Sequence, residues 1–260
     1  GDSFTWGSGL DWNETFPGQF SKRKNLKVIN AAAESYSPTA HIWRYKKLLE
    51  KNILKDGDII IMAVDLSDYI DEYQNWTSSS NGPPSKKNEL SLNNERNLFR
   101  TFFVNNFQNI YKSYLFLRYS NSNFFDKYTI KPITNKFHLK TNQKKNLVIK
   151  QKLNRNIILT SKLAYENKHK FFILIYPWPS QILYPNSFED SYGFNWAYNM
   201  ETICIKSFCD GVINTIPTFR KYALKNTNWY EDLFINGDFH FKKEGNSLIV
   251  DELIKSKLID

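Results

Sequence analysis

The chain has 260 residues, of which 41% are hydrophobic and 16% aromatic, a composition that can fill the core of one α/β domain and argues against a disordered chain. Its net charge of +9 comes from lysines and arginines that are spread over many segments, so we predict no nucleic-acid-binding patch, although a positive surface would favour anionic glycans or membrane surfaces. No apolar run approaches the roughly 18 residues that a membrane-spanning helix requires, so the sequence predicts no span.

Four short segments are rich in Val, Ile, Leu or Phe and are bounded by turn residues, as buried parallel strands are. In chain order, these predicted strands are residues 26–31, 58–64, 170–176 and 211–216. Helical patterns alternate with them, and the predicted helices are residues 38–51, 94–119, 147–167, 195–209 and 243–258. This alternation predicts a parallel sheet with helices on both faces.

We interpret residues 1–260 as a single domain with a helical and loop insertion at about residues 75–167. In open parallel sheets, ligands bind beside the carboxyl ends of the strands. Four residues follow or flank such strand ends in the predicted fold: Ser3, Ala32, Asp65 and His240. We therefore expect one crevice to collect these side chains.

The two ends of the chain carry the parts of a nucleophilic serine site. Ser3 completes a Gly-Asp-Ser motif, and Asp238 and His240 belong to an Asp-Phe-His motif. A serine attacks an ester at neutral pH only if a base takes its proton and another group orients that base. We predict Ser3 as the nucleophile, His240 as the base and Asp238 as the orienting carboxylate, with the backbone N–H of Ser3 binding the oxyanion. The alternative is that the Gly-Asp-Ser motif only caps a helix.

These motifs resemble blocks I and V of the SGNH hydrolases, also called the GDSL family. In that family Gly-Asp-Ser follows the first strand of a three-layer α/β/α, flavodoxin-like parallel sheet, and a loop with an aspartate delivers the histidine before the last helix. The resemblance implies this fold for the present chain. Asp238 lies two residues before His240, whereas three is the commonest family spacing.

Two internal segments resemble the other family blocks and depart from them. In block II a glycine N–H contributes to the oxyanion hole, and Ala32 occupies that place, where its backbone N–H can still serve if its φ and ψ angles permit. Residues 58–68 resemble block III but lack its asparagine, with Val64 or Asp65 in its place depending on the alignment. Because an ionised Asp65 cannot donate a hydrogen bond, either another group substitutes or Asp65 and Asp68 have an orienting role.

Trp178 lies in a Pro-Trp-Pro turn that ends a predicted strand on the crevice side. It is therefore our preferred candidate for a sugar-stacking platform among Trp6, Trp12 and Trp178, although packing in the core is the default role of tryptophan.

Cys204 and Cys209 are the only cysteines, and they are too few for a zinc site. We expect them to be buried free thiols, with a disulfide as the alternative. The sequence has no Gly-rich phosphate loop and no cluster of metal ligands, so we predict no cofactor and no metal.

In the SGNH family a buried strand directly precedes Gly-Asp-Ser, and this sequence begins without a methionine. We therefore expect the chain to be a fragment whose segments 26–31 and 58–64 border the position of that strand. Unpaired strand edges there would be an aggregation hazard. The sequence leaves the oligomeric state and the compartment open, with the periplasm and the extracellular space as candidates.

The resemblance implies a serine esterase that removes acetyl or another short acyl group from a carbohydrate or another small ester. An O-acyltransferase that modifies a polysaccharide would form the same acyl-enzyme and pass the acyl group to a sugar hydroxyl. A third interpretation is a non-catalytic glycan-binding domain, and it is motivated by the missing asparagine of block III.

Overall fold

The structure is a computed structural model, and the residues that it describes are 1–74, 84, 143–183, 196–235 and 238–257. Within them, three parallel strands form one sheet in the order β1-β2-β3. The strands are β1 (Ile59–Val64), β2 (Lys170–Ile175) and β3 (Gly211–Asn214). This part of the chain therefore has a mixed α/β fold, and three of the four predicted strands are confirmed.

The sequence of β2 explains its central place. A parallel strand with helices on both faces has no solvent side, so its residues are apolar in succession rather than in alternation. Four of its side chains, Phe171, Ile173, Leu174 and Ile175, are completely buried. Strand β1 is less covered, because its first three residues, Ile59 to Ile61, are only half-buried.

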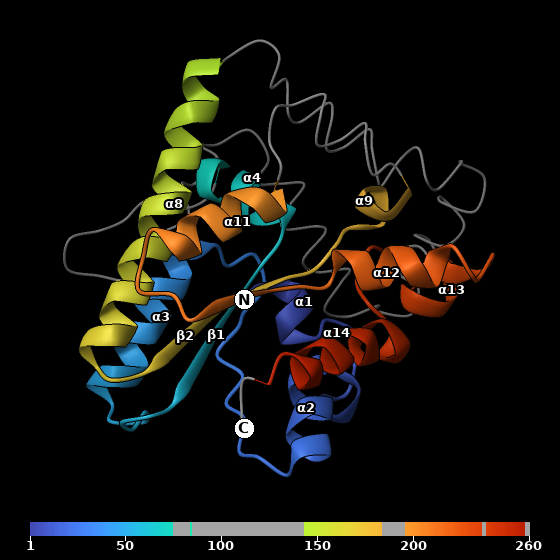
Figure 1. The fold of residues 1–260 in the computed structure, drawn as a ribbon, viewed down its shortest axis with the longest axis horizontal. Helices are drawn as coiled ribbons and strands as arrows, with labels where there is room; N and C mark the ends of the chain where they lie inside the picture. The colour runs from blue at the N-terminus through green and yellow to red at the C-terminus, as the bar shows by residue number, and fades with distance from the viewer. Residues whose placement is uncertain (75–83, 85–142, 184–195, 236–237, 258–260) are drawn as a thin grey trace, which may run out of the picture.

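Helices lie on both sides of the sheet (Figure 1). One side has α3 (Pro38–Glu50), α4 (Leu66–Gln74), α8 (Gln143–Glu166) and α11 (Trp196–Ile205). The other side has α1 (Ser3–Trp6), α2 (Phe16–Lys24), α12 (Ile216–Ala223), α13 (Trp229–Leu233) and α14 (Lys243–Lys255). Two shorter helices are η1 (Trp12–Glu14) and α9 (Pro179–Leu183). No helix in the described ranges is long and apolar enough to cross a membrane.

Helices α3, α8, α11 and α14 confirm four predicted helices, with bounds that differ by a few residues. Helix α3 begins at Pro38, whose fixed φ suits the first turn and whose missing N–H costs nothing there. The predicted helix at residues 94–119, and most of the predicted insertion at 75–167, lie outside the described residues. Helix α8 packs against β2 and α3.

The predicted strand at residues 26–31 is wrong, because residues 26–33 are neither helix nor strand. A strand needs a hydrogen-bonded neighbour, and the described residues supply none beside this segment. Instead, the segment forms one wall of a largely apolar groove of about 500 Å³, and β1 forms the opposite wall. The free edge of β1 therefore faces this groove.

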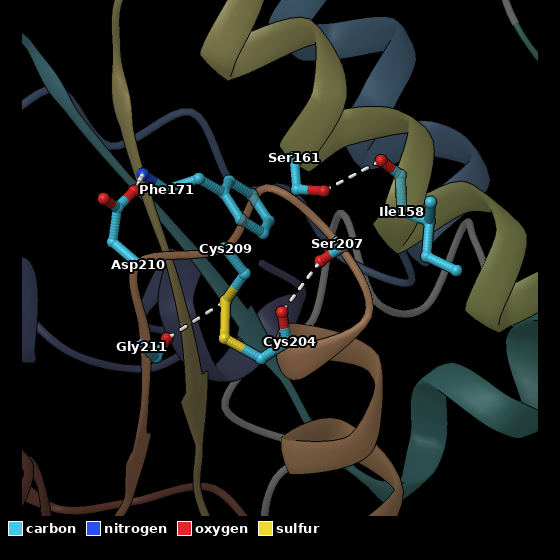
Figure 2. Close-up of a disulfide and its surroundings, with 8 residues drawn as sticks. All are labelled: Ile158, Ser161, Phe171, Cys204, Ser207, Cys209, Asp210 and Gly211. Carbon is cyan, nitrogen blue, oxygen red and sulfur yellow. Dashed lines mark hydrogen bonds between the residues drawn. A yellow bond between two sulfur atoms is a disulfide. The ribbon is translucent and has the colours of Figure 1, made fainter.

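Cys204 and Cys209 form a disulfide, so our expectation of free thiols is wrong (Figure 2). Cys204 lies near the end of α11, and Cys209 lies just before β3. Asp210 fixes the short connection: its N–H donates to Phe171 O (2.8 Å), and its Oδ2 accepts from Phe171 N–H (2.6 Å). The chain thus turns back at once, which leaves the two cysteine Cα atoms 4.8 Å apart, within the range that a disulfide can bridge.

Candidate active site

Ser3 is the first residue of α1, a helix of four residues. Asp2 caps this helix, since its Oδ1 accepts from the N–H of Phe4 (3.1 Å). Gly7 ends it in the left-handed conformation at φ 88°, which glycine adopts without steric cost. Because Asp2 is the cap, the hydroxyl of Ser3 remains available for another partner.

The three predicted catalytic residues lie together. Ser3 Oγ is 2.8 Å from His240 Nε2, and His240 Nδ1 is 2.7 Å from Asp238 Oδ1. A neutral imidazole that donates from Nδ1 to the carboxylate presents an unprotonated Nε2 to the serine hydroxyl. The arrangement therefore has the order nucleophile, base and orienting carboxylate.

The loop that carries His240 is closed by its own hydrogen bonds. The N–H of Ile235 donates to His240 O (2.8 Å), and the N–H of Asp238 donates to Ile235 O (2.8 Å). Tyr230 OH donates to Asp238 O (2.6 Å). Asp238 Oδ1 also accepts from the N–H groups of Phe239 (2.6 Å) and His240 (3.2 Å). Because the side chain of Asp238 folds back over its own loop, a spacing of two residues suffices for it to reach the imidazole.

The charge state of Asp238 suits this contact. Burial opposes ionisation, but the hydrogen bond and the positive charge of His240, with two backbone N–H groups, outweigh it and lower the pKa of Asp238. The side chains of Asp238 and His240 are 43% and 14% exposed. Asp238 is therefore ionised at neutral pH and remains partly in contact with water.

Two aromatic rings pack against the imidazole of His240. The ring of Phe4 lies with its centroid 4.8 Å away, and that of Phe239 lies 4.6 Å away. Phe4 follows the nucleophile and Phe239 precedes the base in sequence. The same packing therefore holds the helix with Ser3 against the loop with His240.

The oxyanion donors are only partly in place. The N–H of Ser3 lies at the start of α1 and has no acceptor within the described part of the chain. The N–H of Ala32 donates to Asn30 Oδ1 (3.1 Å), while Asn30 Nδ2 donates to Thr5 O (2.8 Å). A role of Ala32 in the oxyanion hole stays a prediction. It requires the N–H of Ala32 to release Asn30 Oδ1 and to donate to a substrate oxygen instead.

Asp65 and Asp68 are buried and bind donors of the protein itself. Asp65 Oδ1 accepts from the N–H (2.7 Å) and the hydroxyl (2.6 Å) of Ser67, and its Oδ2 accepts from Trp178 Nε1–H (2.6 Å). Asp68 Oδ2 accepts from the N–H of Asp65 (2.8 Å). These contacts are with Ser67, Trp178 and the backbone of Asp65 rather than with Ser3 or His240, so an orienting role of the two carboxyl groups stays a prediction.

The expectation that Trp178 is a sugar-stacking platform is wrong. Its side chain is only 7% exposed, and it stacks on the ring of Phe239 with centroids 4.7 Å apart and planes 11° from parallel. The reason is that its N–H needs an acceptor when buried, and Asp65 supplies one inside the protein. Trp6 and Trp12 are 53% and 44% exposed.

Sequence reasoning missed the contacts that hold Asp2. Tyr176 OH donates to Asp2 Oδ1 (2.6 Å), and Ser67 Oγ lies 3.2 Å from Asp2 Oδ2. The only signal was that Asp2 directly precedes the nucleophile and that Tyr176 follows a predicted strand. Within the described ranges, no three His, Cys, Asp or Glu side chains gather as metal ligands.

Comparisons of the chain with protein-family models, with curated proteins and with solved structures found no match. The functional assignment therefore rests on the geometry of the site.

The pair Asp65 and Asp68 makes stability depend on pH. Burial, followed by the charge of Asp2, raises the pKa of Asp65 well above its usual range, and burial, followed by the charges of Asp65 and Asp2, does the same for Asp68. Asp68 Oδ1 is buried with no hydrogen-bond partner among the described residues, so this carboxyl group lacks a donor that would stabilise its ionised form. A carboxyl whose pKa is raised by folding binds more protons in the folded state, and its contribution to stability is lost as pH rises through that pKa.

Asp68→Asn should remove this loss, because an asparagine keeps the acceptor for the N–H of Asp65 and cannot ionise. We expect the free energy of unfolding of the variant, relative to the wild type, to increase between about pH 5 and about pH 8. Urea unfolding at both pH values measures this difference. Asp251→Asn, on the surface beside Arg23, is the control and should show no such increase. If the free energy of unfolding of Asp68→Asn changed with pH in parallel with that of the wild type, Asp68 would not be the source of the pH dependence.

Proposed function

We propose that this protein is a serine esterase that releases a short acyl group, in the first instance acetyl, from a carbohydrate or another small ester. The observation that carries the proposal is the chain of contacts from Ser3 Oγ to His240 Nε2 (2.8 Å) and from His240 Nδ1 to Asp238 Oδ1 (2.7 Å). The choice of acetyl and carbohydrate follows from the resemblance of the Gly-Asp-Ser and Asp-Phe-His motifs to those of SGNH hydrolases.

The reaction begins when His240 Nε2 takes the hydroxyl proton of Ser3 and Ser3 Oγ bonds to the carbonyl carbon of the ester. The tetrahedral intermediate then collapses, its bond to the alcohol oxygen breaks, and Nε2 returns the proton to the leaving alcohol. Water repeats the sequence on the acyl-enzyme, giving the carboxylic acid and free Ser3. Asp238 stabilises the imidazolium that forms in each half.

The negative oxygen of the intermediate needs donors that are fixed in advance. The N–H of Ser3 is the first of them. The N–H of Ala32 becomes the second when it exchanges Asn30 Oδ1 for the substrate oxygen. Asp65 takes no part in this step, because its oxygens accept from Ser67 and Trp178.

We also propose the finer fold, a three-layer SGNH-type sheet in which a further parallel strand lies in the groove between residues 26–33 and β1. The groove runs along Ile59 to Ala63, about the usual length of a strand. The N–H of Ala33 donates to Gly1 O (3.4 Å), so backbone already pairs with the wall of the groove that residues 26–33 form. Such a strand would pair with β1 and cover its half-buried residues.

Amide hydrogen exchange on the protein as its gene encodes it tests this strand. The N–H groups of β1 that do not donate to β2 should exchange about as slowly as those that do, because both edges would be paired. If the groove-facing N–H groups of β1 exchanged about tenfold faster or more than the N–H groups that donate to β2, as frayed strand ends do, the proposal would be contradicted.

Ser3→Ala should abolish hydrolysis of p-nitrophenyl acetate and of acetylated oligosaccharides, lowering turnover by about 10⁴-fold or more. The measurement follows free acetate and transferred acetyl in parallel. Ser8→Ala is the matched control, since Ser8 lies close in sequence and its hydroxyl donates to Glu34 Oε1 (3.0 Å) rather than to His240. Unchanged turnover in Ser3→Ala would overturn the proposal. Acetyl found mainly on a sugar acceptor would reassign the protein as an O-acyltransferase.

Asp238→Asn should leave the fold intact and lower turnover by about 10³–10⁴-fold, because the imidazole tautomer that accepts from serine is no longer favoured. Turnover and the thermal midpoint should be measured together. Asp232→Asn is the control, since Asp232 accepts from Tyr222 OH (3.1 Å) rather than from His240. Turnover within a few-fold of the wild type would leave only Ser3 and His240 in the mechanism.

A further inference from the structure

Asp65 is a fully buried carboxylate at the carboxyl end of β1, and its donors come from two different parts of the fold. Ser67, in the first turn of α4, donates to Oδ1 from its N–H (2.7 Å) and its hydroxyl (2.6 Å). Trp178, after the end of β2, donates to Oδ2 from its indole N–H (2.6 Å). A buried carboxylate is costly unless such donors surround it, so Asp65 fixes the relative positions of both partners.

On one side, the contacts of Asp65 lead to the nucleophile. The hydroxyl of Ser67 also lies 3.2 Å from Asp2 Oδ2. Asp2 in turn caps α1 through the N–H of Phe4 (3.1 Å) and accepts from Tyr176 OH (2.6 Å). The position of Asp2 determines where α1 starts, and Ser3 is the first residue of that helix.

On the other side, the contacts lead to the base. The hydrogen bond to Asp65 sets the plane of the Trp178 indole. That plane stacks almost parallel on Phe239, at 4.7 Å and 11°. Phe239 lies between Asp238 and His240, and its ring centroid is 4.6 Å from that of the imidazole.

We propose that Asp65 is a positioning residue that holds the helix with Ser3 and the loop with His240 in register, through Ser67 and Asp2 on one side and through Trp178 and Phe239 on the other. The kinetic consequence rests on the proposed esterase function, whereas the geometric consequence does not. The side chain must be an aspartate here. An asparagine has a single acceptor oxygen, so its NH₂ group would face either the Ser67 N–H or the Trp178 N–H, donor against donor.

A buried carboxylate elsewhere in the fold provides the control. Glu72, on the same helix α4, accepts from Thr39 Oγ1–H (2.7 Å) and pairs with Lys152 (2.7 Å). It is buried like Asp65, but these partners tie α4 to α3 and α8. Removing its charge should therefore lower stability without changing the geometry between Ser3 and His240.

The experiment compares Asp65→Asn, Trp178→Phe and Glu72→Gln in the full chain. Hydrolysis of p-nitrophenyl acetate gives kcat and KM, and proton NMR follows the Nδ1–H of His240, whose hydrogen bond to Asp238 shifts it far downfield. We expect kcat to fall about tenfold or more in Asp65→Asn and Trp178→Phe, with KM within about twofold, since small displacements of reacting groups cost rate rather than binding. The Nδ1–H signal should broaden or move in both variants. Glu72→Gln should lower the thermal midpoint and leave kcat and the signal unchanged.

Wild-type kcat and an unchanged Nδ1–H signal in Asp65→Asn would overturn the inference. If that variant fails to fold, Trp178→Phe decides, because it keeps an aromatic ring against Phe239 while it removes the indole N–H that bonds to Asp65. If the wild type shows no turnover, the esterase proposal fails, but the NMR comparison still tests the positioning role of Asp65. An Nδ1–H signal that is lost in Asp65→Asn and kept in Glu72→Gln supports that role. A signal that is kept in both variants overturns it.

Discussion

Two carboxylates that lie out of water, Asp2 and Asp65, constrain the whole crevice end of the sheet. Neither carboxyl group can be buried without large cost unless it has hydrogen-bond partners. The donors are the hydroxyl of Tyr176, the hydroxyl of Ser67 and the indole N–H of Trp178. They come from the end of β2, the start of α4 and the turn before α9, so satisfying these two buried carboxyl groups brings the three segments to one place.

Aromatic packing then converts this polar framework into a rigid site. Phe4 lies with its ring centroid 5.2 Å from Tyr176, 5.0 Å from Phe241 and 4.8 Å from His240. Close-packed interiors allow few alternative rotamers, and rings at these separations contribute attraction beyond the area that they bury. The imidazole is therefore oriented by hydrogen bonds along its plane and by rings beside it.

The sequence predicted those parts of the molecule that depend on local pattern. Buried strands such as β2 carry continuous apolar runs, and helices such as α3 begin at a proline, so both kinds of element were found. Residues 26–31 have the composition of a strand, but a strand exists only beside a neighbour, and pattern alone does not supply one. The disulfide depended on how Asp210 turns the chain back toward β2, which the spacing of two cysteines does not reveal.

The same contrast holds within the site. Ser3, Asp238 and His240 could be predicted because each belongs to a short motif whose chemistry requires the others. The bond between Asp65 and Trp178 could not, since it joins residues 113 positions apart and neither one has a motif that requires the other. Trp178 was the preferred candidate for a sugar-stacking platform, but it packs in the interior, because a ring from a third part of the chain, Phe239, stacks on it.

The distance between nucleophile and base along the chain has a consequence for biosynthesis. Ser3 and His240 are 237 positions apart, so a ribosome releases the serine long before the imidazole that would activate it. A growing or truncated polypeptide carries only an ordinary alcohol at Ser3, with no reactivity toward the esters around it. Folds that depend on contacts of such long range also form slowly, so the reactive serine of the proposed esterase would appear only after both ends of this chain have come together.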